Sequence, residues 1–181
     1  MYVYTLLTGQ GNIMMRELFI LRHGKADTPE GLADFDRPLK KRGREDSKWI
    51  GRWLHDRKLL PDYVLSSPAI RALQTAQRVC KQLDFDLEAI EYEHGIYEAY
   101  PDTLVSVLKK CPHSAQRVLL VGHNPGLEGL IVKLTGYSEP LPDDASRLSP
   151  AAMVQLVFEG DWDQLTEGCA KWVALVRPEN L

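Results

Sequence analysis

Three segments of the chain place a cationic or imidazole side chain directly after a run of strand-forming residues. Arginine binds phosphate and carboxylate oxygens through paired hydrogen bonds, and a neutral imidazole can act as a nucleophile. These residue types predict a pocket for a phosphoryl or carboxylate group in which a histidine does the chemistry. The side chains are Arg22 and His23 after residues 17–21, Arg71 after 62–66, and His123 after 117–122.

The elements that would position these residues are parallel strands, each followed by a helix. Parallel strands end at one edge of a sheet, and open α/β sheets bind their ligands there. Ser67-Pro68 and Asn124-Pro125 predict two helix starts, because serine and asparagine cap helices and proline fits the first helical turn. The amino ends of these helices would add unpaired N–H groups and a positive dipole to the pocket.

Each residue also has a plainer interpretation when it is taken alone. An early helical arginine usually lies on a solvated face, and a lone histidine is usually a surface residue. Three strand-to-helix junctions, each with a cationic or imidazole side chain, within 181 residues favour a shared site instead. Spacing does not decide whether His23 or His123 is the nucleophile, and the other three histidines, His55, His94 and His113, are interpreted as structural or solvated.

Four motifs, in this order along the chain, resemble the histidine phosphatase superfamily and its small branch typified by the SixA phosphohistidine phosphatases. The resemblance runs from about residue 18 to about residue 135. It implies a phosphoglycerate mutase-like α/β fold: a three-layer sandwich whose mostly parallel sheet has helices on both faces. It also implies that no metal and no organic cofactor is needed. The motifs are 21–26, 36–39 with Gly43, 66–68 with Arg71 and 74–76, and 121–125.

The resemblance gives each residue a role. His23 would attack phosphorus to form a phosphohistidine enzyme intermediate, and Arg22, Arg71 and His123 would bind the phosphoryl oxygens. Relatives that cleave phosphate esters use a carboxylate after the third strand as proton donor. Glu93 and Glu98 lie in that region. Glu98 is our candidate proton donor, and the alternative is that it is an ordinary surface carboxylate.

The substrate predicted by this resemblance is a phosphohistidine displayed on a protein, such as a phosphotransfer domain or a phosphocarrier. The segment between Arg71 and His123 is short, so it leaves little chain to form a lid over the pocket. An open pocket also admits small phosphoesters, and a small-molecule phosphomonoesterase is therefore one alternative. A phosphate-binding sensor without turnover is the alternative from another functional class. The short chain disfavours a phosphoglycerate mutase.

Length and composition set the remaining expectations. Residues 15–181 are predicted to form one domain, and residues 1–14 a loose or non-native extension, with translation starting at Met14 or Met15. A net charge of −3 without a long basic run argues against a nucleic-acid partner, and no apolar run is long enough to span a bilayer. Three widely spaced cysteines indicate a reducing compartment rather than a metal site. A cytoplasmic monomer is expected.

Further patterns complete the predicted fold. Trp49, Ile50, Trp53 and Leu54 recur at helical spacing and predict a helix that packs on the sheet. A further strand is expected around residues 90–93 and a helix through 104–108. Residues 152–158 and 170–176 predict a C-terminal antiparallel hairpin, since their connection is too short for a helical crossover. The loop before residue 38 is expected near the pocket, with Asp34 and Asp36 structural and the role of Arg37 left open.

Overall fold

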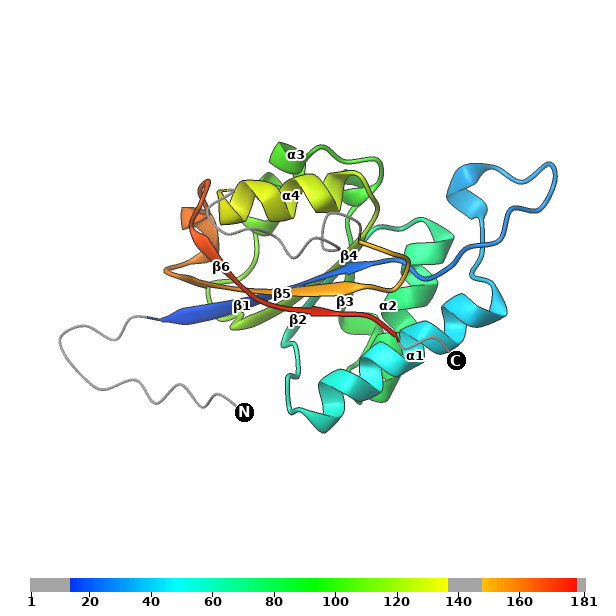
Figure 1. Cartoon of the computed structure of the whole chain (residues 1–181), viewed down its shortest axis with the longest axis horizontal. Coiled ribbons are helices and arrows are strands. Elements are labelled where there is room, and N and C mark those ends of the chain that lie inside the picture. The colour runs from blue at the N-terminus through cyan, green and yellow to red at the C-terminus, as the bar shows by residue number, and fades with distance from the viewer. Residues whose placement is uncertain (1–13, 137–147, 179–181) are drawn as a thin grey trace.

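A computed structural model describes residues 14–136 and 148–178. A mixed six-stranded sheet lies between two layers of helices, which confirms the predicted three-layer α/β sandwich (Figure 1). The strand order is β3-β2-β4-β1-β5-β6. Most of the predicted extension, residues 1–13, falls outside the described residues. The strands are β1 (Met15–Arg22), β2 (Tyr63–Ser66), β3 (Ile90–Tyr92), β4 (Arg117–Gly122), β5 (Met153–Glu159) and β6 (Ala170–Val176).

Two helices cover each face of the sheet (Figure 1). Successive residues of a strand point to opposite faces, so Phe19 and Leu21 of β1 pack toward α1 and α2. Leu18 and Ile20 pack toward α3 and α4. Burial on both faces explains why the central strands read as continuous apolar runs. The helices are α1 (Lys41–Asp56), α2 (Ile70–Gln82), α3 (Pro101–Leu108) and α4 (Gly126–Thr135), and the short 3-10 helices are η1 (Asp34–Asp36), η2 (Leu87–Ala89), η3 (His94–Ile96) and η4 (Trp162–Gln164).

The sheet topology brings the three predicted strand-to-helix junctions together. β4 pairs in parallel with both β1 and β2, and β3 pairs in parallel with β2. The register places Arg22 opposite Gly122 and Ser66 opposite Val121, so these strands end at one edge. β5 runs antiparallel to β1 and to β6, which confirms the C-terminal hairpin. Among the described helices, none is long and apolar enough to cross a bilayer.

Both predicted helix starts were wrong by one or two residues. α2 begins at Ile70, because the backbone N–H of Ser67 still bonds the Val121 carbonyl of the neighbouring strand at 3.0 Å. α4 begins at Gly126, and the Asn124 amide does not cap it. That amide instead donates to Glu128 at 2.6 Å and to the Leu148 carbonyl at 3.0 Å. Tertiary contacts thus use the side chains that the sequence suggested as caps.

A close backbone contact joins the segment after β1 to the first turn of α1. A Cβ atom added to Gly43 would lie 2.6 Å from the Lys25 nitrogen and still closer to the Lys25 oxygen. A Cβ atom added to Gly24 would lie 2.6 Å from the Gly43 oxygen. Neither neighbour is a flexible side chain, so the backbone itself would have to move. The glycines allow α1 to hold the residue that follows His23.

We expect Gly43→Ala to lower the free energy of unfolding by about 1–3 kcal/mol, because the added methyl group forces the 24–25 backbone away from α1. Urea unfolding monitored by circular dichroism measures this. Glu45→Ala, an exposed change on the same helix, is the control and should stay within about 0.5 kcal/mol of the parent. Equal stabilities of Gly43→Ala and this control would show that the contact is not constraining.

Candidate active site

His23 lies half-buried where β1 ends, with one ring nitrogen committed to the backbone. Its Nδ1 lies 2.8 Å from the Gly24 carbonyl oxygen. A carbonyl only accepts hydrogen bonds, so Nδ1 carries the proton and Nε2 keeps its lone pair. Nε2 accepts a hydrogen bond from Arg71 Nε at 3.3 Å. The ring therefore presents a nucleophilic nitrogen directly beside a guanidinium group.

Arg71 is buried in the first turn of α2, and a threonine ties that turn to the loop that carries His23. Thr75 donates from Oγ1 to the Arg71 carbonyl at 2.7 Å and accepts from the Gly24 N–H at 3.0 Å. Thr75 is fully buried, and it lies one helical turn after Arg71. Together these two hydrogen bonds of Thr75 connect the turn that carries Arg71 to the backbone next to His23. The threonine was part of a quoted motif, but its role was not predicted.

His123, which follows β4, and Arg22, the last residue of β1, complete the cluster. The rings of His23 and His123 have centroids 5.0 Å apart, and His123 Nε2 lies 2.8 Å from Ser67 Oγ. Arg22 Nη1 donates to the Leu148 carbonyl at 2.8 Å. His123 Nδ1 and Arg22 Nε are buried without a hydrogen-bond partner among the described residues. Buried polar atoms are nearly always paired, so two unpaired ones at one corner indicate a place for a ligand.

The histidines of this cluster are held neutral. Burial is the main cause that lowers the pKa of His23 to about 4, and the charges of Arg71 and Arg22 lower it further, whereas the Gly24 hydrogen bond opposes the shift. Burial also lowers the pKa of His123 to about 3, followed by the effects of His23 and Arg71. Desolvation disfavours a charged imidazole. The nucleophilic form of His23 is thus the prevailing form at neutral pH.

The low pKa of His123 predicts a pH-dependent stability. In the unfolded chain histidine titrates near pH 6.5, so between there and about pH 3 the unfolded state binds a proton that the folded state does not. The contribution is complete above pH 6.5 and is lost as the pH falls. We expect His123→Asn to reduce the loss of stability between pH 6.5 and 4.5 by on the order of 1 kcal/mol per pH unit.

Urea unfolding at both pH values tests this expectation. His55 has an exposed side chain on α1, and His55→Asn is the matched control, which should keep the parental pH dependence. A parental slope in His123→Asn would contradict a buried, neutral imidazole at this position.

Asp34 is the main site residue whose contacts the sequence did not reveal. Its carboxylate forms an ion pair with Arg71, with Nη2 and Oδ2 2.8 Å apart, and Oδ2 also accepts from the Tyr97 hydroxyl at 2.9 Å. Oδ1 accepts from Arg37 Nη1 at 2.8 Å. The hydrogen bond from Arg37 is the largest cause that lowers the pKa of Asp34 to about 2. Our structural interpretation of this carboxylate was incomplete, because Asp34 contacts the guanidinium beside His23.

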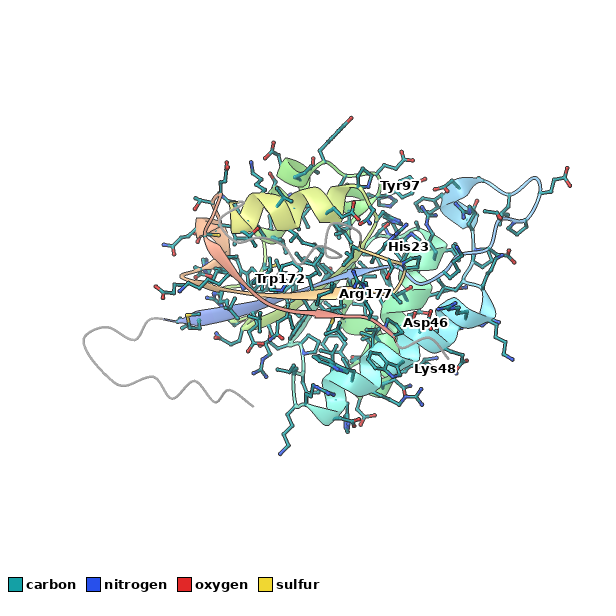
Figure 2. All side chains as sticks on the ribbon, viewed as in Figure 1. His23, Asp46, Lys48, Tyr97, Trp172 and Arg177 are labelled. Carbon is teal, nitrogen blue, oxygen red and sulfur yellow. The ribbon has the colours of Figure 1, made fainter. Side chains whose placement is uncertain are left out.

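Aromatic side chains surround the same corner. The Tyr97 ring meets the His123 ring edge-on at 5.5 Å, and the Phe35 ring contacts Tyr97 at 5.1 Å. The exposed His94 ring stacks on Phe35, with the ring centroids 6.4 Å apart. Figure 2 shows His23 and Tyr97 at the same end of the sheet.

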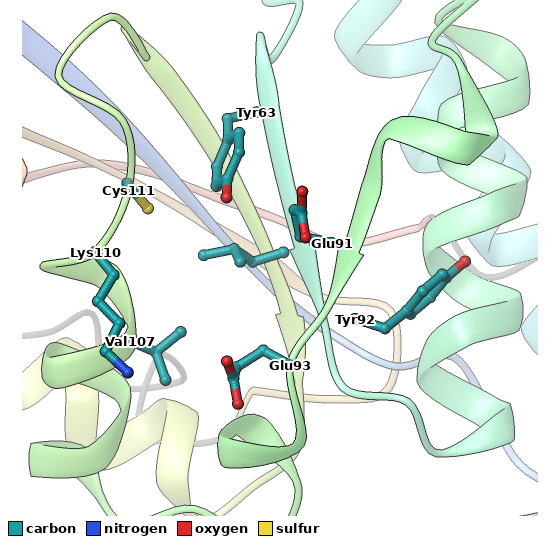
Figure 3. A pocket seen from close by; sticks show the side chains of 8 residues that line it. Tyr63, Glu91, Tyr92, Glu93, Val107, Lys110 and Cys111 are labelled. Atoms are coloured by element: carbon teal, nitrogen blue, oxygen red, sulfur yellow. The ribbon is translucent and has the colours of Figure 1, made fainter.

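Neither carboxylate considered as proton donor contacts the cluster through a hydrogen bond. Glu98 is exposed, has a φ of 50°, and bonds no described side chain. Glu93 accepts from the Gly95 N–H at 2.8 Å, which caps η3. Glu93 also lines a separate hollow beside β3 (Figure 3), which contains none of the predicted site residues. The lining of that hollow is Tyr63, Leu65, Glu91, Tyr92, Glu93, Val107, Lys110 and Cys111.

A group of potential metal ligands among the described residues lies at the opposite edge of the sheet. His113, Asp161 and Asp163 place one ligand atom each within 4.8 Å of one another. Arg16 already pairs with Asp161 at 2.8 Å, and His113 contacts the same carboxylate. Their position before β4 and after β5 separates them from the cluster at the strand ends. They do not contribute to the candidate active site.

The cluster places two neutral imidazoles and two arginines together at the carboxyl edge of an α/β sheet. Residues 18–104 match the family described as the histidine phosphatase superfamily, branch 1. The chain is 30% identical over 131 residues to the phosphohistidine phosphatase SixA of Escherichia coli, which covers 68% of this chain and 77% of that protein. It is 32% identical over 162 residues to an uncharacterized protein of Mycobacterium tuberculosis, covering 87% and 99% of the two chains.

Solved structures agree with these sequence relatives. The crystal structure of the putative phosphohistidine phosphatase SixA from Agrobacterium tumefaciens superposes with a TM-score of 0.76 at 27% identity, covering 90% of this chain and 98% of that one. The structure of a putative phosphohistidine phosphatase SixA from Nakamurella multipartitia gives a TM-score of 0.79 at 24% identity, with 92% of this chain and 98% of that one covered. The chain belongs to the histidine phosphatase superfamily, in its SixA-like branch. It is a phosphatase of that superfamily.

Proposed function

We propose that the chain hydrolyses phosphohistidine on proteins through a phosphohistidine intermediate on His23. The observation that carries the proposal is the cluster itself. His23 Nε2 lies 3.3 Å from Arg71 Nε, while Arg22 Nε and His123 Nδ1 are buried and unpaired among the described residues. A phosphoryl group in contact with Arg71 would supply oxygens for these atoms. The arginine charges would neutralise it without a metal.

The proposed reaction has two steps. His23 Nε2 donates its lone pair to phosphorus in line with the departing atom, and that atom leaves with the electron pair of the broken bond. Water then attacks the phosphorus, the P–N bond to His23 breaks, and phosphate is released. Arg22, Arg71 and His123 hold the equatorial oxygens in both steps. Gly24 keeps the proton on Nδ1, so Nε2 remains the attacking atom.

The lack of an engaged acid favours an imidazole leaving group. An alkoxide needs a proton from a general acid, whereas an imidazole protonated at its other nitrogen leaves as a neutral ring. Glu98 stays our candidate acid for ester substrates, but its exposed side chain bonds nothing in the described structure. The name of the Escherichia coli relative, phosphohistidine phosphatase, supports the same substrate class. The three cysteines are free, which agrees with the cytoplasmic location we propose.

The proposal predicts a preference for phosphohistidine over phosphoesters, and this preference should not depend on Glu98. We expect the parent protein to release phosphate from a histidine-phosphorylated protein with a higher kcat/KM than from a panel of small phosphoesters. Glu98→Gln should retain protein turnover within about threefold, since the leaving imidazole needs no acid. A phosphate-release assay measures both. Preferential ester cleavage that collapses in Glu98→Gln would instead identify a small-molecule phosphomonoesterase with Glu98 as its acid.

A further inference from the structure

The contacts of Asp34 suggest a role beyond closing the loop, and that role rests on the function proposed above. Two neighbouring N–H groups of the Arg71 guanidinium have different partners. Nε contacts His23 Nε2 at 3.3 Å, and Nη2 contacts Asp34 Oδ2 at 2.8 Å. The guanidinium is planar and rigid, so its width fixes the separation of nucleophile and carboxylate. A phosphoryl group bound to Arg71 beside His23 would lie against Asp34.

Asp34 cannot move far from this position. Its backbone carbonyl accepts from Arg71 Nη1 at 2.5 Å, and its side chain is held by Arg37 and Tyr97 at 2.8 and 2.9 Å. If a phosphoryl oxygen displaces Oδ2 from Nη2, these three bonds still hold the carboxylate next to the bound group. A fixed negative charge therefore remains beside the phosphoryl site during the reaction.

The carboxylate is more exposed than the imidazole of His23. The His23 residue is partly buried, whereas the Asp34 side chain is 47% exposed. In-line attack by His23 Nε2 sends the leaving group away from the imidazole, and we infer that it departs toward solvent, beside the exposed Asp34. Asp34 is also ionised, since its pKa is lowered to about 2, and it has no proton to give to an alkoxide. It can accept a hydrogen bond from a leaving group but cannot act as its acid.

We propose that Asp34 is a specificity-determining residue that selects an imidazole leaving group. Its carboxylate accepts a hydrogen bond from the free N–H of the substrate's phosphoimidazole ring and stabilises the cationic form of that ring. When His23 Nε2 forms its bond to phosphorus, the substrate P–N bond breaks and its electron pair returns to the ring nitrogen. The ring keeps the proton on its other nitrogen and leaves as neutral imidazole. Near a phosphoester, the same carboxylate repels the developing alkoxide.

The test compares two peptides of identical sequence that carry either phosphohistidine or phosphoserine. In Asp34→Asn the side-chain shape is kept and the charge is removed. We expect kcat/KM for the phosphohistidine peptide to fall about tenfold or more, as one lost charge interaction allows, and that for the phosphoserine peptide to stay or rise. Asp36→Asn, in the same exposed turn, is the matched control and should keep the parental ratio.

The outcomes separate this inference from the proposed function. A parallel fall for both peptides, or an unchanged ratio, would show that Asp34 only builds the loop. Inorganic phosphate should bind Asp34→Asn at least as tightly as the parent, because the carboxylate no longer competes for Arg71; weaker binding would also overturn the role. Failure of the proposed function would appear in the parent itself, as absent turnover of the phosphohistidine peptide, and would remove the selection role with it.

Discussion

His23→Ala should lose roughly 10⁴-fold or more in turnover of any phosphorylated substrate, because it deletes the atom that bonds to phosphorus. Among the described residues, His23 is the histidine whose ring nitrogen hydrogen-bonds Arg71, whereas His123 Nε2 lies 2.8 Å from Ser67 Oγ. The substitution also removes the hydrogen bond from the imidazole Nδ1 to the Gly24 carbonyl oxygen. Stopped-time phosphate release with a histidine-phosphorylated protein measures the loss.

Phosphate binding provides the control for that variant. In His23→Ala the proposed phosphate-binding residues Arg22, Arg71 and His123 remain, so the variant should still bind inorganic phosphate. It should also unfold cooperatively. His123→Ala should cost less, about 10²–10³ in turnover, because it removes one oxyanion donor and leaves the nucleophile. If His123→Ala abolished turnover and His23→Ala left a substantial rate, the assignment of the two histidines would be reversed. The sequence alone left that choice open.

Arg71→Ala should reduce turnover by about 10²–10³-fold and weaken phosphate binding. Arg71 is the only described residue that hydrogen-bonds both the His23 side chain and Asp34, through Nε and through its two terminal nitrogens. Its removal therefore loses an oxygen donor and also releases the loop of η1. Arg71→Lys should restore little, since an ammonium group cannot reproduce a planar fork. Steady-state kinetics with the phosphohistidine peptide measures kcat and KM separately.

Arg78 offers a matched control on the same helix. It lies two turns after Arg71 and donates to the Gln74 carbonyl at 3.3 Å, away from His23. Arg78→Ala should keep parental kinetics. If kcat/KM of Arg71→Ala differed from that of Arg78→Ala by less than about threefold, the proposed role of Arg71 in binding the phosphoryl group would be contradicted.

The positions of the strand ends were predictable, because the apolar runs that mark the strands stop next to the residues that could bind an anion. Continuous apolar runs mark strands buried on both faces, and the three runs stop at Arg22, Ser66 and Gly122. The parallel register then brings Arg22, His23 and His123 to one edge, as the pairing of β1 with β4 shows. Arg71 follows from the same logic through the helix after β2. The family resemblance was needed to assign a role to each of these residues, including the choice between His23 and His123 as nucleophile.

The contacts of Asp34 could not be read in the same way. Asp34 and Arg71 are far apart in sequence, and the loop between β1 and α1 has no periodic pattern that fixes its direction. Its position depends on tertiary contacts, such as Arg37 Nε to the Asp27 carbonyl at 2.8 Å and the bridge between Ala26 and Leu39. The helix starts failed for a related reason. Ser67 remains paired to the sheet and contacts His123, so it does not cap α2.

Trapping the intermediate tests the central claim most directly. The protein is mixed with a substrate carrying a radiolabelled phosphoryl group, quenched within milliseconds in alkali, and digested for peptide mapping. A phosphoryl group on His23 should appear, stable in alkali and lost in acid as expected of a P–N bond, and absent from His23→Ala. Turnover without label on His23, or label on His123 instead, would contradict the assignment of His23 as the nucleophile.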